Sequence, residues 1–166
     1  KEKFKAKADL ANIEIKELLK EHGNKKIGEV TLSQVYQGMR GITGLVSETS
    51  LLDSQEGIRF RGYSIPELQQ KLPKVKNGSE PLPEGLFHLM LIGDLPSEEE
   101  TAHITSTWQR RSHVPNHVFA TIDALPVNAH PMTMFVTGIM ALQTESNFAK
   151  EYARGLNKKD YWNPIY

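Results

Sequence analysis

From residue 64 to residue 155, helix start and stop signals follow one another at short intervals, and this succession most constrains the fold. Ser64-Ile65-Pro66-Glu67 joins an N-cap serine, a first-turn proline and a capping-box glutamate, and the helix that it opens should end by Pro73. A second helix is predicted from about Pro83 to Ile92, just before Gly93. Caps and prolines predict further helices over residues 97–113, 115–126, 131–144 and 146–155. This part of the chain is therefore predicted to be mostly helical.

The first 64 residues combine one long helix with a small β segment. Glu2 to about His22 lacks proline, spaces apolar residues among Lys and Glu, and stops at Gly23-Asn24, which predicts one amphipathic helix. Thr31-Leu32-Ser33-Gln34 fits a capping box and predicts a short helix. β-prone stretches at residues 27–31, 45–52 and 57–63 predict a small sheet or hairpin. The fold class is thus mainly α, with a small β segment near residues 27–64.

Composition excludes several classes of function. The 20 Lys and Arg residues balance the 20 Asp and Glu residues, which disfavours nonspecific binding to nucleic acid or to a membrane surface. The absence of cysteine excludes disulfides, thiol nucleophiles and Cys-ligated metal sites. No stretch approaches the roughly 18–20 apolar residues that span a bilayer, so we expect a soluble protein. A length of 166 residues predicts a single core.

Two arginine-bearing segments are candidates for binding. The segment of residues 38–44 spaces glycines three apart around Arg40, so that backbone amides and a guanidinium could meet a phosphate. It matches neither GxGxxG nor GxxxxGK[ST], and an ordinary turn therefore stays open as the alternative. Arg59 and Arg61 flank Phe60, and strand alternation predicts that both lie on one solvated or ion-paired face.

The histidines and clustered carboxylates favour structural roles. His113 and His117 are four residues apart, but Pro115 lies between them and no third ligand is near, so we expect no metal. His130 precedes a helix start, where a buried histidine bonded to the backbone is favoured over a catalytic base. Helix capping accounts for the residues of Ser97-Glu98-Glu99-Glu100. The residues alone therefore define no catalytic site.

A series of short segments resembles the amino-terminal part of proteins of the citrate synthase family, mitochondrial type. The segments are Glu21-His22-Gly23, Gly38-Met39-Arg40-Gly41, Glu48-Thr49-Ser50, the run from Glu56 to Glu67, the run from Glu80 to Leu86, Leu125-Pro126, His130-Pro131-Met132, Glu145-Ser146 and Tyr161-Trp162. They cover nearly the whole chain.

This resemblance implies a citrate-synthase-like multi-helical fold, a homodimer and a mitochondrial matrix location. The implied reaction of the tricarboxylic acid cycle condenses acetyl-CoA with oxaloacetate and water to give citrate and CoA, with no metal and no cofactor beyond the acetyl-CoA substrate. Residues 1–166 would form the amino-terminal part of the large helical domain, with the small catalytic domain absent. The aromatic end of the chain, from Tyr161 to Tyr166, is consistent with this because it looks like the opening of a further element.

The resemblance also implies which site residues this segment carries. The family's catalytic Asp and two His residues would lie beyond Tyr166, so no catalytic residue is expected here and the segment alone should be inactive. Arg40 falls on the family's arginine that contacts a phosphate of coenzyme A. Lys158 falls on a basic position that contacts phosphate from the partner subunit, where some members have Arg. Lysine keeps the positive charge but lacks the planar guanidinium group of arginine, so a weaker contact with phosphate is expected.

Other functions remain open at this point. A 2-methylcitrate synthase would use propionyl-CoA, and its acyl pocket lies outside this segment. A noncatalytic, assembly-forming relative or a truncated helical scaffold would keep the fold without the active site. Sequence following Tyr166 would distinguish these from a citrate synthase.

Overall fold

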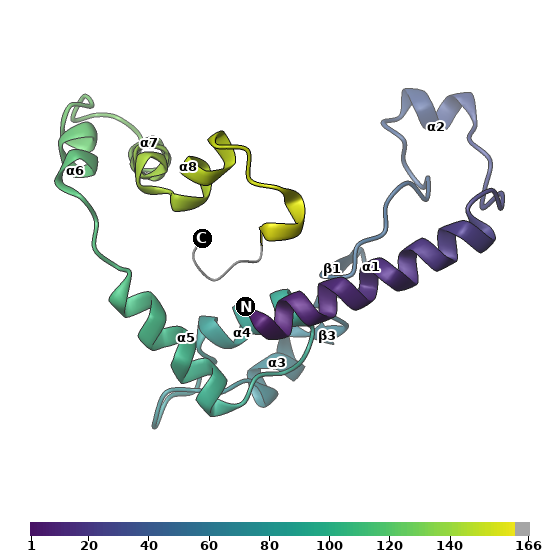
Figure 1. Cartoon of the computed structure of the whole chain (residues 1–166), viewed down its shortest axis with the longest axis horizontal. Helices are drawn as coiled ribbons and strands as arrows, with labels where there is room; N and C mark the ends of the chain where they lie inside the picture. The colour runs from purple at the N-terminus through teal and green to yellow at the C-terminus, as the bar shows by residue number, and fades with distance from the viewer. Residues whose placement is uncertain (162–166) are drawn as a thin grey trace. The chain divides into compact units, whose positions relative to one another are not determined.

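A computed structural model describes residues 1–161 (Figure 1). The chain divides into two compact units. One unit comprises residues 3–103, and the other runs from Ile104 onward and includes Lys1 and Glu2. Each unit is described by itself. Residues 162–166, where most of the aromatic end falls, lie outside the described residues.

The fold is mainly α with a small antiparallel sheet, as the sequence predicts. The first unit contains α1 (Glu2–His22), α2 (Leu32–Tyr36), β1 (Ser50–Asp53), β2 (Gly57–Phe60), β3 (Tyr63–Ser64), α3 (Ile65–Lys71), α4 (Pro83–Ile92) and the start of α5 (Glu98–Arg110). The second unit contains the rest of α5, α6 (Asn116–Asp123), α7 (Pro131–Ala141), α8 (Asn147–Ala153) and the 3₁₀ helices η1 (Leu142–Glu145) and η2 (Lys158–Asp160). No helix among residues 1–161 combines the length and the apolar character that crossing a membrane requires.

Helix boundaries follow the caps that the sequence predicts. The Ser64 amide donates to Glu67 Oε2 at 2.8 Å and the Glu67 amide donates to Ser64 Oγ at 3.4 Å, which completes the capping box of α3. At the C-terminal end of α4, Gly93 adopts a left-handed φ of 87° and ends the helix. Both signals involve residues that are close in sequence, which is why these helix boundaries are predictable.

The three strands form one sheet in the order β1-β2-β3, with both pairs antiparallel. Asp53 closes the β1–β2 turn, because its Oδ1 accepts from the amides of Gln55 at 2.7 Å and Glu56 at 2.9 Å. The prediction of a strand at residues 27–31 is wrong, since no strand forms there, and of residues 45–52 only the end joins β1. The stretch 57–63 is broken between β2 and β3, because Arg61 and Gly62 have φ values of 49° and 86°.

Each unit has its own buried side chains, so the prediction of a single core is wrong. In the first unit, Leu68 and Leu72 pack with Leu89 of α4, which is 0% exposed. The partly buried residues around this cluster are Phe60, Tyr63, Leu86 and Leu95. In the second unit α6 and α7 pack together, and a Cβ on buried Gly138 would lie 2.9 Å from Ile122 Cδ1. Glycine therefore permits the close approach of these two helices.

Candidate functional site

The turn that carries Arg40 follows directly from α2. Thr31 caps this helix in a capping box with Gln34, as predicted. The backbone then adopts left-handed conformations at Gly38, Met39 and Gly41, with φ values of 73°, 60° and 72°. Glycine adopts such values without strain, whereas Met39 does so at a steric cost. The turn is therefore an unusual backbone conformation rather than a simple continuation of α2.

The side chain of Arg40 is exposed and available to a ligand. Among residues 1–161 its guanidinium has no hydrogen-bond or ion-pair partner. A free, planar guanidinium can form two parallel hydrogen bonds with phosphate oxygens. The turn can thus present a positive charge to an anion without first breaking an internal ion pair.

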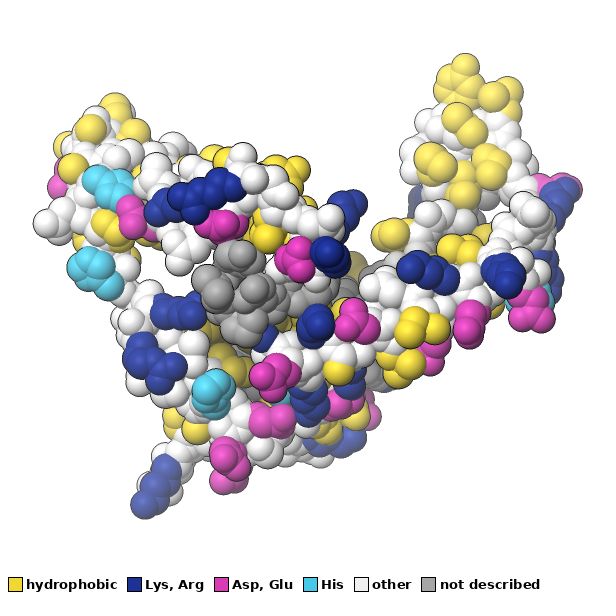
Figure 2. All heavy atoms as spheres, viewed as in Figure 1, with side chains coloured by type: hydrophobic (Ala, Val, Ile, Leu, Met, Phe, Trp, Pro, Cys, Tyr) yellow, Lys and Arg dark blue, Asp and Glu magenta, His cyan; other side chains and the backbone are white. Residues whose placement is uncertain are grey.

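Exposed apolar side chains lie on α2 and within the turn itself. Leu32, Tyr36 and Met39 are 73%, 84% and 59% exposed, and Figure 2 shows hydrophobic side chains gathered over α2. Exposed apolar surface beside an arginine suits a ligand with both charged and apolar parts.

Lys158 is the first residue of η2 and belongs to the other unit. Asn157 caps this short helix, since its Oδ1 accepts from the Lys159 amide at 3.1 Å. Lys158 is exposed, and its ammonium has no partner among the described residues. The structure thus leaves Arg40 and Lys158 each accessible within its own unit.

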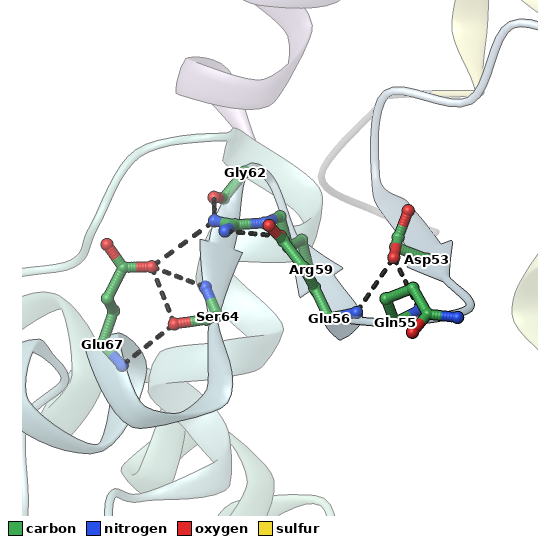
Figure 3. A network of polar contacts seen from close by, with 7 residues as sticks. All are labelled: Asp53, Gln55, Glu56, Arg59, Gly62, Ser64 and Glu67. Carbon is green, nitrogen blue, oxygen red and sulfur yellow. Dashed lines mark hydrogen bonds and ion pairs between the residues drawn. The ribbon is translucent and has the colours of Figure 1, made fainter.

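Arg59 and Arg61 are engaged in internal contacts. Arg59 donates to Glu56 Oε2 at 2.8 Å and to the Gly62 carbonyl at 3.0 Å, and lies 3.7 Å from Glu67 Oε2 (Figure 3). This confirms the predicted ion pairing. The prediction of a shared strand face is wrong, because Arg61 lies past the end of β2 and donates to the Met90 carbonyl at 2.8 Å. Both arginines therefore stabilise the sheet and its contacts with α3 and α4.

Hydrogen bonds favour the ionised forms of two carboxylates near this sheet, those of Glu67 and Asp53. The Ser64 amide and hydroxyl lower the pKa of Glu67, with a smaller contribution from Arg59. The amides of Glu56 and Gln55 lower the pKa of Asp53. These shifts arise from turn and cap chemistry, and they give neither carboxylate the raised pKa expected of a general acid.

A buried histidine on α4 is a polar feature that the sequence does not reveal. His88 is 8% exposed, and its Nε2 lies 3.9 Å from Glu100 Oε2, with no hydrogen-bond partner among the described residues. Burial lowers the pKa of His88, opposed by Glu100 and Asp94 and assisted by Lys3 and Lys7. His88 is therefore favoured in its neutral form. No pattern distinguishes this position, because α4 is apolar on nearly every side.

The remaining candidates from the sequence serve as structural contacts. His130 caps α7 by accepting from the Met132 amide at 3.1 Å, which confirms the backbone contact, but the side chain is exposed rather than buried. His117 Nε2 lies 3.2 Å from the Ala141 carbonyl oxygen. Ser97 and Glu100 form a cap, as predicted, with the Glu100 amide donating to Ser97 Oγ at 3.1 Å. Among residues 1–161, no three His, Cys, Asp or Glu side chains are grouped to hold a metal ion.

Comparison with known proteins places this helical chain among enzymes of one class. A family model described as "Citrate synthase, C-terminal domain" matches residues 38–166, which include the Arg40 turn and Lys158. The chain belongs to the citrate synthase family.

Individual relatives support this assignment. The chain is 55% identical over 152 residues to the mitochondrial citrate synthase of Daucus carota, a match that covers 92% of this chain and 32% of the relative. Identity to the Aspergillus niger mitochondrial citrate synthase is 52% over 163 residues, covering 98% of this chain and 34% of the relative. Identity to a probable mitochondrial citrate synthase of Caenorhabditis briggsae is 49% over 166 residues, covering 100% and 36%. The chain thus spans about a third of the length of these relatives.

Proposed function

We propose that the protein containing these residues is a citrate synthase of the mitochondrial matrix. It condenses acetyl-CoA with oxaloacetate and water to give citrate and free CoA, a step of the tricarboxylic acid cycle. The observation that carries this proposal is the 49–55% identity to citrate synthases named as mitochondrial, over 90% or more of the chain. The mainly helical fold agrees with it.

Residues 1–166 are proposed to be the amino-terminal part of the large helical domain. In this proposal the catalytic Asp and His residues of the family belong to other parts of the protein. The contacts of the local histidines support this, because His130 is occupied in capping α7 and His117 lies against a backbone carbonyl oxygen. This segment then contributes scaffold and substrate binding rather than proton transfer.

Arg40 is proposed to contact a phosphate of coenzyme A. Its exposed guanidinium is free of partners among the described residues, and the turn that holds it lies inside the matched family region. In the proposed homodimer, a second contact comes from the partner subunit's lysine at position 158. Two cations from different subunits would make acetyl-CoA binding depend on dimerisation.

The substitution Arg40→Ala in the full-length protein tests this role. Loss of one charge-assisted hydrogen-bond contact costs about 1.5–3 kcal/mol, and solvent screening at an exposed site favours the lower end. We expect the KM for acetyl-CoA to rise about tenfold, with the KM for oxaloacetate nearly unchanged. Arg111→Ala removes an exposed arginine outside the turn and serves as the matched control.

A substrate without phosphates identifies what Arg40 contacts. Acetylpantetheine carries the thioester but lacks the phosphates of acetyl-CoA, so Arg40→Ala should not change its KM. An unchanged KM for acetyl-CoA in Arg40→Ala would refute the phosphate assignment. An equal effect on both thioesters would also refute it, because the arginine would then act on something other than phosphate.

The isolated segment of residues 1–166 is proposed to be inactive. Incubation with acetyl-CoA and oxaloacetate should release no CoA thiol above the rate without protein. Measurable turnover by this segment would contradict the placement of catalysis outside it.

A further inference from the structure

Gln34 joins the cap of α2 to the turn that carries Arg40. Its Oε1 accepts from the Thr31 amide at 3.0 Å and from the Thr31 hydroxyl at 3.2 Å. From the other end of the same carboxamide, Nε2 donates to the Arg40 carbonyl at 3.4 Å. The backbone takes part too, because the Met39 amide donates to the Gln34 carbonyl at 2.8 Å. One residue therefore contacts both ends of the α2 segment.

The turn needs such support because its conformation is not an intrinsically favoured one. Met39 is held at a left-handed φ of 60°, which non-glycine residues adopt reluctantly. Gln34 is half-buried, whereas the other residues from Thr31 to Met39 are exposed. A Cβ placed on Gly41 would lie 3.9 Å from Gln34 Nε2, so the carboxamide lies against both residues that follow Met39.

We propose that Gln34 is a positioning residue for coenzyme A binding, holding the backbone of Arg40 so that its guanidinium is presented to phosphate. This inference rests on the proposed function of Arg40. Gln34 itself need not touch the ligand. Its contribution is to reduce the number of turn conformations that the free protein must give up on binding.

The substitution Gln34→Glu separates the two contacts of the carboxamide. Glutamate is a preferred residue at this position of a capping box, so the contacts with Thr31 and helix α2 are retained. The carboxylate cannot donate to the Arg40 carbonyl, so the contact with the turn is lost. Gln34→Met, which removes both contacts without adding charge, is the second variant.

Gln37→Glu is the matched control for the added charge. Gln37 lies in the same segment, is exposed, and donates from Nε2 to Ser33 Oγ at 3.1 Å rather than to the turn. It is closer to Arg40 in sequence than Gln34 is. An effect of negative charge alone would therefore appear in both glutamate variants.

The test is steady-state kinetics of the full-length protein. We expect Gln34→Glu and Gln34→Met to raise the KM for acetyl-CoA by about two- to tenfold, the range for loss of one neutral hydrogen bond. The value of kcat and the KM for oxaloacetate should stay at wild-type levels, as should both KM values of Gln37→Glu. In the Arg40→Ala background, Gln34→Glu should have no further effect, because it acts through Arg40.

Two results would overturn the inference while leaving the role of Arg40 intact. One is a rise in KM for Arg40→Ala together with wild-type KM values for both Gln34 variants. The other is an equal rise in Gln34→Glu and Gln37→Glu, which would show an effect of charge alone. If Arg40→Ala itself leaves the KM for acetyl-CoA unchanged, the proposed phosphate contact and this inference both fall.

Discussion

Replacing Leu89 by alanine should open the core of the first unit. The side chain is 0% exposed and packs with Leu68 and Leu72, so truncation removes buried methyl groups and leaves a cavity. Buried Leu→Ala changes cost about 2.7–5 kcal/mol. Among the described residues this cluster has only three buried members, which allows partial collapse, so we expect the lower end of that range, about 3 kcal/mol. That corresponds to roughly a 150-fold larger population of the open state.

Amide hydrogen exchange of the full-length protein measures this opening locally. Peptides covering α3 and α4 should exchange about two orders of magnitude faster in Leu89→Ala than in the wild type. The control is Leu91→Ala, which makes the same chemical change on the same helix at a side chain that is 44% exposed. Exchange in Leu89→Ala that is less than about fivefold faster, or equal to that in Leu91→Ala, would refute the assignment of the core.

Three further outcomes are expected. Burial lowers the pKa of His88 below its ordinary 6.5, so the contribution of neutral His88 to stability is present above pH 6.5 and is lost as the pH falls. From about pH 7.5 to about pH 5.5, the melting temperature of the wild type should therefore fall more than that of His88→Phe. Equal falls in the two proteins would contradict this. Lys158→Arg should lower the KM for acetyl-CoA, because it supplies a planar guanidinium that can form two hydrogen bonds with phosphate. An unchanged KM would argue against a phosphate contact at Lys158. Gly41→Ala forces a side chain to a φ of 72°, at a cost of about 1–2 kcal/mol, and should raise the KM for acetyl-CoA; kinetics like those of wild type would show that the turn tolerates rearrangement.

Helices were predictable from sequence because their boundaries depend on residues a few positions apart. The capping box at Ser64 and the span from Pro83 to Ile92 both appear in the structure as predicted. A strand, in contrast, depends on a partner that the local sequence does not specify. Residues 27–31 have β-prone composition, but no neighbouring strand pairs with them and they stay irregular.

Burial on α4 could not be predicted for a related reason. The helix is apolar on nearly all sides, so periodicity does not separate buried Leu89 from half-exposed Leu91. It also gives no reason to bury His88. Arg61 is a similar case, because its bond to the Met90 carbonyl joins residues 29 positions apart and depends on a left-handed backbone at Arg61 itself.

Only part of the Arg40 site can be predicted from residues that are close in sequence. Residue chemistry alone left the glycine turn open between an ordinary turn and a phosphate site, and the resemblance to citrate synthases favoured the latter. The contact of Gln34 with Thr31 is a capping box across three residues and was predictable. The contact of the same side chain with the Arg40 carbonyl exists only because Gly38 and Met39 turn the chain back toward α2. The family resemblance therefore proposes Arg40 as a phosphate contact, whereas the proposed role of Gln34 in positioning Arg40 emerges only from the backbone conformation of the turn.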